Sequence, residues 1–144
     1  MISRPENTNS LPEIEGLEII EQIGKGASSY VYKARQKILD RLVVAKVLSP
    51  LAIFDQESMR RFQNEAKQSS LLNHPNIVSI LSYGVSADGR AYLVMEYAEG
   101  HSLAEELERN GRLTLEMFRD IFSAVLAGLG NCPSVRNCSP RHKT

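Results

Sequence analysis

The sequence lacks the features that mark membrane proteins and nucleic-acid-binding proteins. No run approaches the roughly 18 apolar residues that a membrane-spanning helix needs. The first ten residues, M-I-S-R-P-E-N-T-N-S, contain no apolar signal core, so we expect a cytoplasmic protein without a membrane segment. Basic and acidic residues both number 17, so no net charge attracts nucleic acid or cations, and we expect no nucleic-acid partner.

Cysteine is also scarce. The two cysteines, Cys132 and Cys138, are too few for a zinc site, and we predict no metal site in the chain. The absence of tryptophan excludes nothing. An apolar content of 42% can support a hydrophobic core, and 144 residues suit one domain or part of one.

Two glycines interrupt an apolar stretch near the N-terminus. The run L-E-I-I-E-Q-I precedes G-K-G-A-S-S, and Y-V-Y-K-A-R follows it, which is typical of two strands joined by a flexible loop. Gly24 and Gly26 lack a β-carbon, so the backbone can adopt positive φ and present N–H groups to phosphate. Taken singly, the glycines are better explained by an ordinary hairpin turn. Lys46 lies in the apolar run L-V-V-A-K-V-L, where a buried ammonium needs a partner or an anionic ligand.

The order of these parts distinguishes between the known glycine-rich motifs. A P-loop or a Rossmann fingerprint requires a helix after its glycines, whereas Tyr30-Val31-Tyr32 continues as a strand. The series of strand, G-x-G-x-x-S-x-V, strand, turn and embedded lysine resembles the glycine-rich loop and third-strand lysine of protein kinases.

A helical pattern begins at Asp55, a suitable N-cap, and ends at His74-Pro75. Within it, R-F-Q-N-E-A-K followed by H-P-N-I-V resembles the αC helix of protein kinases. The resemblance implies that Glu65 pairs with Lys46 and holds the ammonium toward the α- and β-phosphates of a nucleotide. Without that resemblance, Glu65 is better explained as one more solvated charge on a helix.

The next two predicted strands, Ile77–Val85 and Arg90–Tyr97, are joined by Asp88-Gly89, a strong hairpin signal. The second, R-A-Y-L-V-M-E-Y-A-E-G, resembles the fifth kinase strand and the interlobe hinge. The resemblance implies that Met95 is the gatekeeper and that Glu96 C=O and Ala98 N–H bind the adenine edge. The implied nucleotide site comprises Ile23, Gly24, Lys25, Gly26, Ala27, Ser28, Ser29, Val31, Val44, Lys46, Met95, Glu96, Ala98 and Ser102.

Two residues depart from the family pattern. Val44 stands where relatives have alanine and would narrow the pocket, and Ser29 replaces the third loop glycine. Ser102 occupies the position at which many relatives contact the ribose, and it can also cap the helix that follows.

The expected fold class is α+β. A kinase-like N-terminal lobe, with a five-stranded antiparallel sheet and the αC helix, precedes a hinge and two helices that resemble αD and part of αE. The expected segments are a mobile leader 1–15, the N-terminal lobe 16–95, the hinge 96–101, an incomplete C-terminal lobe 102–129 and an unstructured tail 130–144. We expect Phe118, Phe122, Val125 and Leu126 to lack cover unless a partner protein supplies it.

The tail shows no periodicity, and the resemblance is expected to stop at Leu129. Permitted codons for the tail, read one base later, spell A-H-x-x-G-I-V-H-R-D-I-K-P, a run typical of kinases at this place. We therefore interpret residues 130–144 as an out-of-frame product, which the DNA sequence would test.

The resemblance implies a serine/threonine protein kinase domain, whose relatives transfer the γ-phosphate of ATP to a protein hydroxyl with Mg²⁺. The chain contains no H-R-D or D-F-G segment, so the family's catalytic aspartate and Mg²⁺ ligands are missing. We therefore predict weak ATP binding and no catalysis by this chain alone. The alternative is a non-catalytic, pseudokinase-like module that docks another protein; the sequence identifies neither substrate nor partner.

Overall fold

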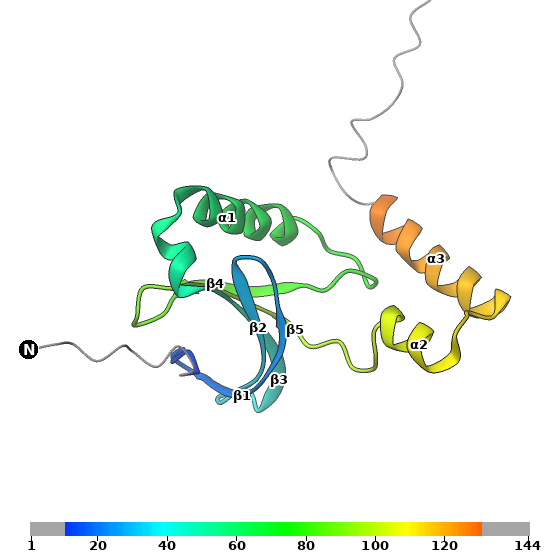
Figure 1. Cartoon of the computed structure of the whole chain (residues 1–144), viewed down its shortest axis with the longest axis horizontal. Helices are drawn as coiled ribbons and strands as arrows, with labels where there is room; N and C mark the ends of the chain where they lie inside the picture. Colours follow the sequence, from blue (N-terminus) through cyan, green and yellow to red (C-terminus); the bar gives the residue numbers. More distant parts are fainter. Residues whose placement is uncertain (1–10, 131–144) are drawn as a thin grey trace, which may run out of the picture. The chain divides into compact units, whose positions relative to one another are not determined.

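The structure is a computed structural model that describes residues 11–130, and Figure 1 shows its elements. It confirms the α+β class and the five-stranded antiparallel sheet, whose strand order is β1-β2-β3-β5-β4. The elements are β1 (Leu17–Lys25), β2 (Ser29–Gln36), β3 (Arg41–Leu48), η1 (Pro50–Phe54), α1 (Gln56–Ser70), β4 (Ile80–Val85), β5 (Ala91–Glu96), α2 (Leu103–Asn110) and α3 (Leu115–Gly130). Cys132, Cys138 and the proposed out-of-frame tail from residue 131 onward lie outside the described residues.

Alternation along the strands gives the sheet two apolar faces. On β3, Val43, Ala45 and Val47 point to one side, and Val44, Lys46 and Leu48 point to the other. One buried cluster consists of Ile14, Leu17, Tyr32, Ala34, Val43, Ala45, Val47 and Val94. The second cluster includes α1 and consists of Leu48, Ala52, Phe62, Ala66, Ala91 and Leu93. The helix therefore covers the sheet face that carries Lys46.

The hydrophobic core begins before β1. Ile14 is only 3% exposed and belongs to the first cluster. Its carbonyl accepts a hydrogen bond from Leu17 N–H at 3.1 Å, and the carbonyl of Gly16 accepts one from Lys37 N–H at 3.0 Å. A single apolar residue between two glutamates carries no periodic signal, so the sequence placed Ile14 in the leader. The structure places it in the core.

Local polar contacts set the start of α1, and the helix ends at Ser70, before the His74-Pro75 that the sequence predicted as its end. Asp55 accepts hydrogen bonds from the N–H groups of Glu57 and Ser58, both at 3.2 Å, as expected for an N-cap. The short helix η1 precedes it and was not predicted. After α1, Ile77 N–H donates to His74 C=O at 3.0 Å in a turn. Because of that turn, β4 begins at Ile80 rather than at Ile77, where the sequence placed it.

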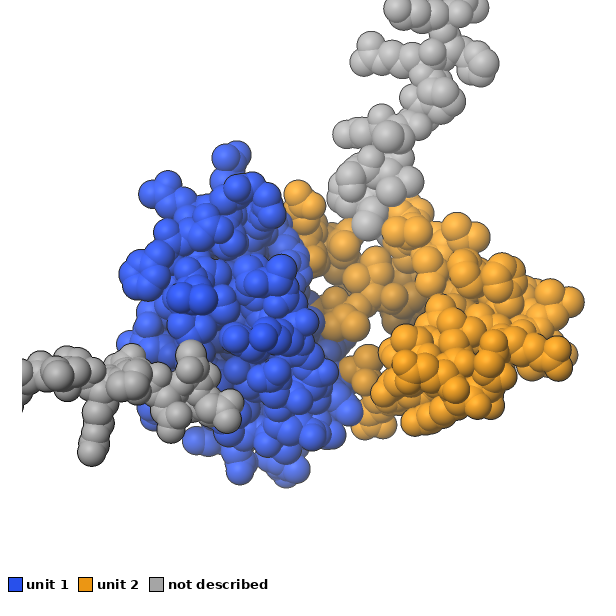
Figure 2. Space-filling view, in the orientation of Figure 1, with its two compact units in different colours: residues 1–66, 80–97 blue, residues 67–79, 98–144 orange. Residues whose placement is uncertain are grey.

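The chain divides into two compact units, coloured separately in Figure 2. Among the described residues, the sheet unit comprises residues 11–66 and 80–97, and the helical unit comprises residues 67–79 and 98–130. Within the helical unit, Asn76 donates a side-chain hydrogen bond to Ala124 C=O at 3.0 Å. A β-carbon on Gly128 would lie 3.2 Å from Ile77 Cγ1, so the loop after α1 packs closely on α3.

Most apolar residues of α3 are exposed. They are Leu115, Phe118, Phe122, Val125, Leu126 and Leu129. Across residues 11–130, no helix has both the length and the apolar character that crossing a bilayer requires.

Candidate functional site

An ion pair joins the middle of the sheet to α1. Lys46 Nζ on β3 lies 2.5 Å from Glu65 Oε1 on α1, although the two residues are nineteen positions apart in the chain. The Lys46 side chain is 22% exposed and the Glu65 side chain is 49% exposed. The ammonium is therefore held in a partly buried position by a carboxylate that water still reaches.

The Lys46–Glu65 ion pair adds little to the stability of the fold. Ion pairs that water reaches contribute about 0.2–1 kcal/mol, and removing a lysine from water opposes even that gain. Lys46 Nζ also lies 5.9 Å from the centroid of the Phe62 ring, so an aromatic side chain flanks the charge. The ion pair therefore contributes little to the stability of the fold. An ammonium that is held in place beside an apolar surface is instead suited to binding an anion.

Half-buried apolar side chains surround Lys46 on its face of the sheet. Val31 lies directly opposite Lys46 on β2, and Val44 lies opposite Met95 on β5. All three apolar residues are half-buried. Ala45 points to the opposite face and is fully buried in the first cluster. The valine at position 44 therefore occupies the same face as Lys46, as strand alternation predicts.

The glycine-rich loop is a tight connection between β1 and β2. Gly26 N–H donates to Ser29 C=O at 2.7 Å, and Ser28 C=O accepts from Ser49 N–H at 2.9 Å. Among the described residues, the glycines with positive φ are Gly16, Gly89, Gly100 and Gly111. Gly24 and Gly26 do not use the positive-φ conformations open to glycine in this structure.

Close packing is what the two loop glycines permit. A β-carbon on Gly24 would lie 3.4 Å from Val31 Cβ, because the two residues pair across β1 and β2. A β-carbon on Gly26 would lie 3.2 Å from Ser29 Oγ. Ser29, which replaces the third loop glycine, is buried. Ile23 lies at a register shift of β1 and remains half-exposed.

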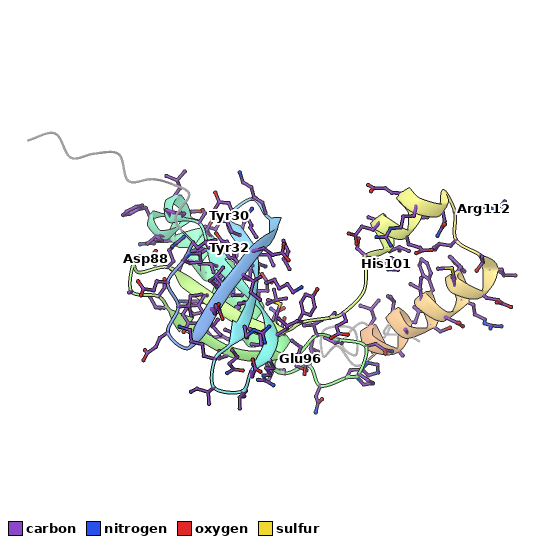
Figure 3. All side chains as sticks on the ribbon, turned by 90° about the horizontal axis from the view of Figure 1, so that it is seen from below. Tyr30, Tyr32, Asp88, Glu96, His101 and Arg112 are labelled. Atoms are coloured by element: carbon purple, nitrogen blue, oxygen red, sulfur yellow. The ribbon has the colours of Figure 1, made fainter. Side chains whose placement is uncertain are left out.

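The predicted hinge begins where β5 ends. Figure 3 labels Glu96 at the end of β5, where it pairs with Val43 of β3. Ala98 and Ser102 belong to the helical unit. Ser102 forms a capping box: its hydroxyl accepts from Glu105 N–H at 3.2 Å, and Glu105 Oε2 accepts from Ser102 N–H at 2.6 Å. The hydroxyl predicted for the ribose is thus already an acceptor in the helix cap.

Sequence reasoning missed one side chain on the Lys46 face. Lys33 of β2 lies opposite Val44, and its Nζ is 4.8 Å from the centroid of the Tyr97 ring. The same ammonium lies 4.0 Å from Glu21 Oε1 on β1. The alternation that places Val31 on this face could have located Lys33, because the two are separated by one residue.

The described residues provide no cluster of ligands that would hold Mg²⁺ by itself. Magnesium prefers oxygen ligands, mostly carboxylates and phosphates. Residues 11–130 contain no group of three or more His, Cys, Asp or Glu side chains that could hold a metal ion. No chemical step is therefore assigned to a metal held by this part of the chain.

The fold and the site together define the class of protein. A five-stranded antiparallel sheet, a glycine hairpin at its first two strands and a third-strand lysine paired with a helix glutamate are the parts that ordered protein kinase motifs imply. The family model for the protein kinase domain matches residues 17–136, so the chain belongs to the protein kinase domain family. The match continues past Leu129, where the sequence resemblance was expected to stop.

Bacterial relatives narrow the class to Hanks-type serine/threonine kinase domains. Serine/threonine-protein kinase pkn3 of Myxococcus xanthus is 41% identical over 109 residues, covering 76% of this chain and 20% of the relative. Serine/threonine-protein kinase PrkC of Bacillus subtilis is 43% identical over 112 residues, covering 75% of this chain and 17% of the relative. The chain thus spans about a fifth of the length of these curated relatives.

Proposed function

We propose that this chain is the ATP-binding part of a serine/threonine protein kinase domain. The observation that supports this most is the 2.5 Å contact between Lys46 and Glu65, which lie on separate elements. Glu65 orients the ammonium, and Lys46 binds the α- and β-phosphates of ATP. The glycine loop, from Lys25 to Ser29, covers the phosphates from above with backbone N–H groups other than that of Gly26, which donates to Ser29 C=O.

The adenine lies against the apolar residues around Lys46. The half-buried Val31, Val44 and Met95 form its walls together with the exposed Ile23, and these side chains leave apolar surface for a purine. Glu96 C=O and Ala98 N–H bind the adenine edge, and Ser102 lies at the ribose. Because Val44 carries two more methyl groups than alanine, the pocket is narrower and ATP binding is weak.

Phosphoryl transfer requires groups that these 144 residues do not contain. Protein kinases use a catalytic-loop aspartate to accept the substrate proton, and a following asparagine and the D-F-G aspartate to hold Mg²⁺. Neither H-R-D nor D-F-G occurs in the sequence. We therefore propose that this chain by itself binds ATP weakly and transfers no phosphate. Its cofactor is ATP, and its protein substrate or docking partner is unidentified.

Thermal unfolding with and without ATP tests the proposed site. Millimolar ATP should raise the Tm of the wild-type chain, and Lys46→Met should abolish the rise. Lys37→Met, which removes the same charge from an exposed residue after β2, should preserve it. An equal rise in all three proteins would place ATP elsewhere. Radiolabelled phosphotransfer that Lys46→Ala abolishes would show that the chain is catalytic after all.

A second function is favoured by the exposed apolar face of α3. Phe118 and Phe122 stack with their ring centroids 4.3 Å apart on this face, and both are more than 40% exposed. In this alternative the chain is a non-catalytic, pseudokinase-like module that docks a protein. A stoichiometric partner recovered equally with and without ATP, and lost in Phe118→Ser, would favour it.

A further inference from the structure

Lys33 contacts the residue that lies between the two proposed adenine-binding backbone groups. Its Nζ is 4.8 Å from the centroid of the Tyr97 ring, and Tyr97 is bonded to Glu96 on one side and to Ala98 on the other. We propose that Lys33 is a positioning residue that anchors the start of the hinge through Tyr97. The proposal rests on the ATP site described above.

Strand register explains why a lysine on β2 can reach the hinge. Lys33 pairs with Val44 on β3, and Val44 pairs with Met95 on β5. The three residues form one row across the sheet on the Lys46 face. Met95 is two residues before Tyr97, and the Lys33 ammonium meets the Tyr97 ring just past the end of β5.

The surroundings of Lys33 favour contact with the ring over contact with water. Its side chain is only 24% exposed, which is unusual for a lysine on a half-open sheet face. The carboxylate of Glu21, its cross-strand neighbour, lies 4.0 Å from the ammonium and is 59% exposed. It therefore attracts the Lys33 ammonium only weakly. Tyr97 is half-buried, and a partly desolvated cation near a ring is attracted more strongly than an exposed one.

The anchor acts on the backbone of the hinge. The contact with Lys33 holds the Tyr97 side chain against the sheet. The N–H of Tyr97 belongs to the peptide group that links it to Glu96, and its C=O belongs to the peptide group that links it to Ala98. Holding the ring therefore limits rotation of both peptide groups. The adenine edge then meets groups that are already oriented, which lowers the entropy cost of binding.

Amide hydrogen exchange tests the anchor without any ligand. Lys33→Met should speed exchange at the amides of Tyr97 and Ala98 by about 2- to 5-fold, the range that an ordinary cation–π contact supports. Tyr97→Leu should have the same effect, and the double variant should add little to it. Lys33→Arg and Tyr97→Phe keep a cation and a ring, so both should behave as the wild type does. Unchanged exchange in Lys33→Met would overturn the proposal, whatever the chain binds.

Nucleotide affinity tests whether the anchor serves the adenine. Lys33→Met should weaken the binding of ATP by about 2- to 5-fold. The affinity for tripolyphosphate, which has no purine, should not change. Lys33→Arg should restore ATP affinity, and Lys37→Met should not alter it. Equal weakening of ATP and tripolyphosphate would assign Lys33 to the phosphates and overturn the positioning role. If the wild type binds no ATP, the proposed function fails, and the exchange result alone decides whether Lys33 holds Tyr97.

Discussion

The sheet unit and the helical unit differ in how much of their own apolar surface they bury. In the sheet unit, Val43, Val47, Leu48 and Leu93 are fully buried, and two clusters fill both faces of the sheet. In the helical unit, α3 is the more apolar of the two helices, yet Gly128 is the only residue of this helix that is buried. The sheet unit, whose helix α1 is less apolar than α3, therefore buries more of its apolar side chains than the helical unit does.

The difference shows that amphipathic pattern does not ensure burial. Alternation supplies each strand with partners on both sides, because its neighbours in the sheet are fixed by backbone hydrogen bonds. A helix has no such fixed neighbour, and its apolar face is buried only where another element packs on it. We infer that most of the stability of residues 11–130 resides in the sheet unit.

The largest effect should follow from a cavity in the core of the sheet. Leu93→Ala removes a fully buried side chain from the second cluster, and such changes cost roughly 2–5 kcal/mol. The matched change Leu126→Ala, on the exposed face of α3, should cost less than about 1 kcal/mol. Urea unfolding measures both, and similar losses would remove the contrast between the units.

A methyl group placed between β4 and β5 should cost somewhat less. A β-carbon on Gly84 would lie 2.4 Å from Tyr92 Oη, so Gly84→Ala forces the ring of its cross-strand partner to move. Overpacking of this kind costs roughly 1–3 kcal/mol. Gly130→Ala on α3 is the control, because no neighbouring side chain among residues 11–130 lies within 4 Å of the added carbon. Thermal unfolding should show a lower Tm for the first variant only.

Loss of the α2 cap should act within the helical unit alone. Ser102→Ala removes the hydroxyl that accepts from Glu105 N–H, a loss of about 1 kcal/mol for a typical cap. Amide exchange should become faster along α2 and stay unchanged in β3 and β5. Ser102→Asp, which keeps an acceptor at the cap, should restore the wild-type rates. Faster exchange in the strands would mean that the two units unfold together.

The smallest effect should come from acid. The side chain of Arg90 donates a hydrogen bond to Asp88 and holds the pKa of that carboxyl below its ordinary value. A lowered pKa stabilises the fold above the ordinary pH of aspartate titration, near 4, and the contribution is lost as pH falls further. The Asp88 side chain is 47% exposed, so screening limits the gain to on the order of 0.5 kcal/mol.

Asp88→Asn measures that contribution. The variant should be slightly less stable than the wild type at pH 7, and the gap between the two should narrow toward pH 3. Denaturant unfolding at each pH gives both values. A gap that grows in acid would show that Asp88 is not stabilised as an anion.

Local patterns predicted the elements well where one signal dominates. Alternation fixed the strands and the shared face of Val44 and Lys46, and the N-cap of Asp55 fixed the start of α1. Weak signals failed: Ile14 was left out of the core, and the turn at His74 that delays β4 was not recognised. Isolated apolar residues and single turns have no period to detect, so only their surroundings reveal them.

The sequence by itself determined the order of the parts: a glycine hairpin, a lysine in an apolar strand and a helix with a glutamate at the right place. Tertiary structure decided which of these parts meet. Lys46 and Glu65 come within 2.5 Å, and Lys33 reaches Tyr97, only because strand register brings β2, β3 and β5 together and packing places α1 on the sheet. Such contacts join residues far apart in the chain, so the pattern of one segment alone does not predict them. The pairing of Lys46 with Glu65 was expected only from the resemblance to protein kinases, and the contact of Lys33 with Tyr97 was not expected at all.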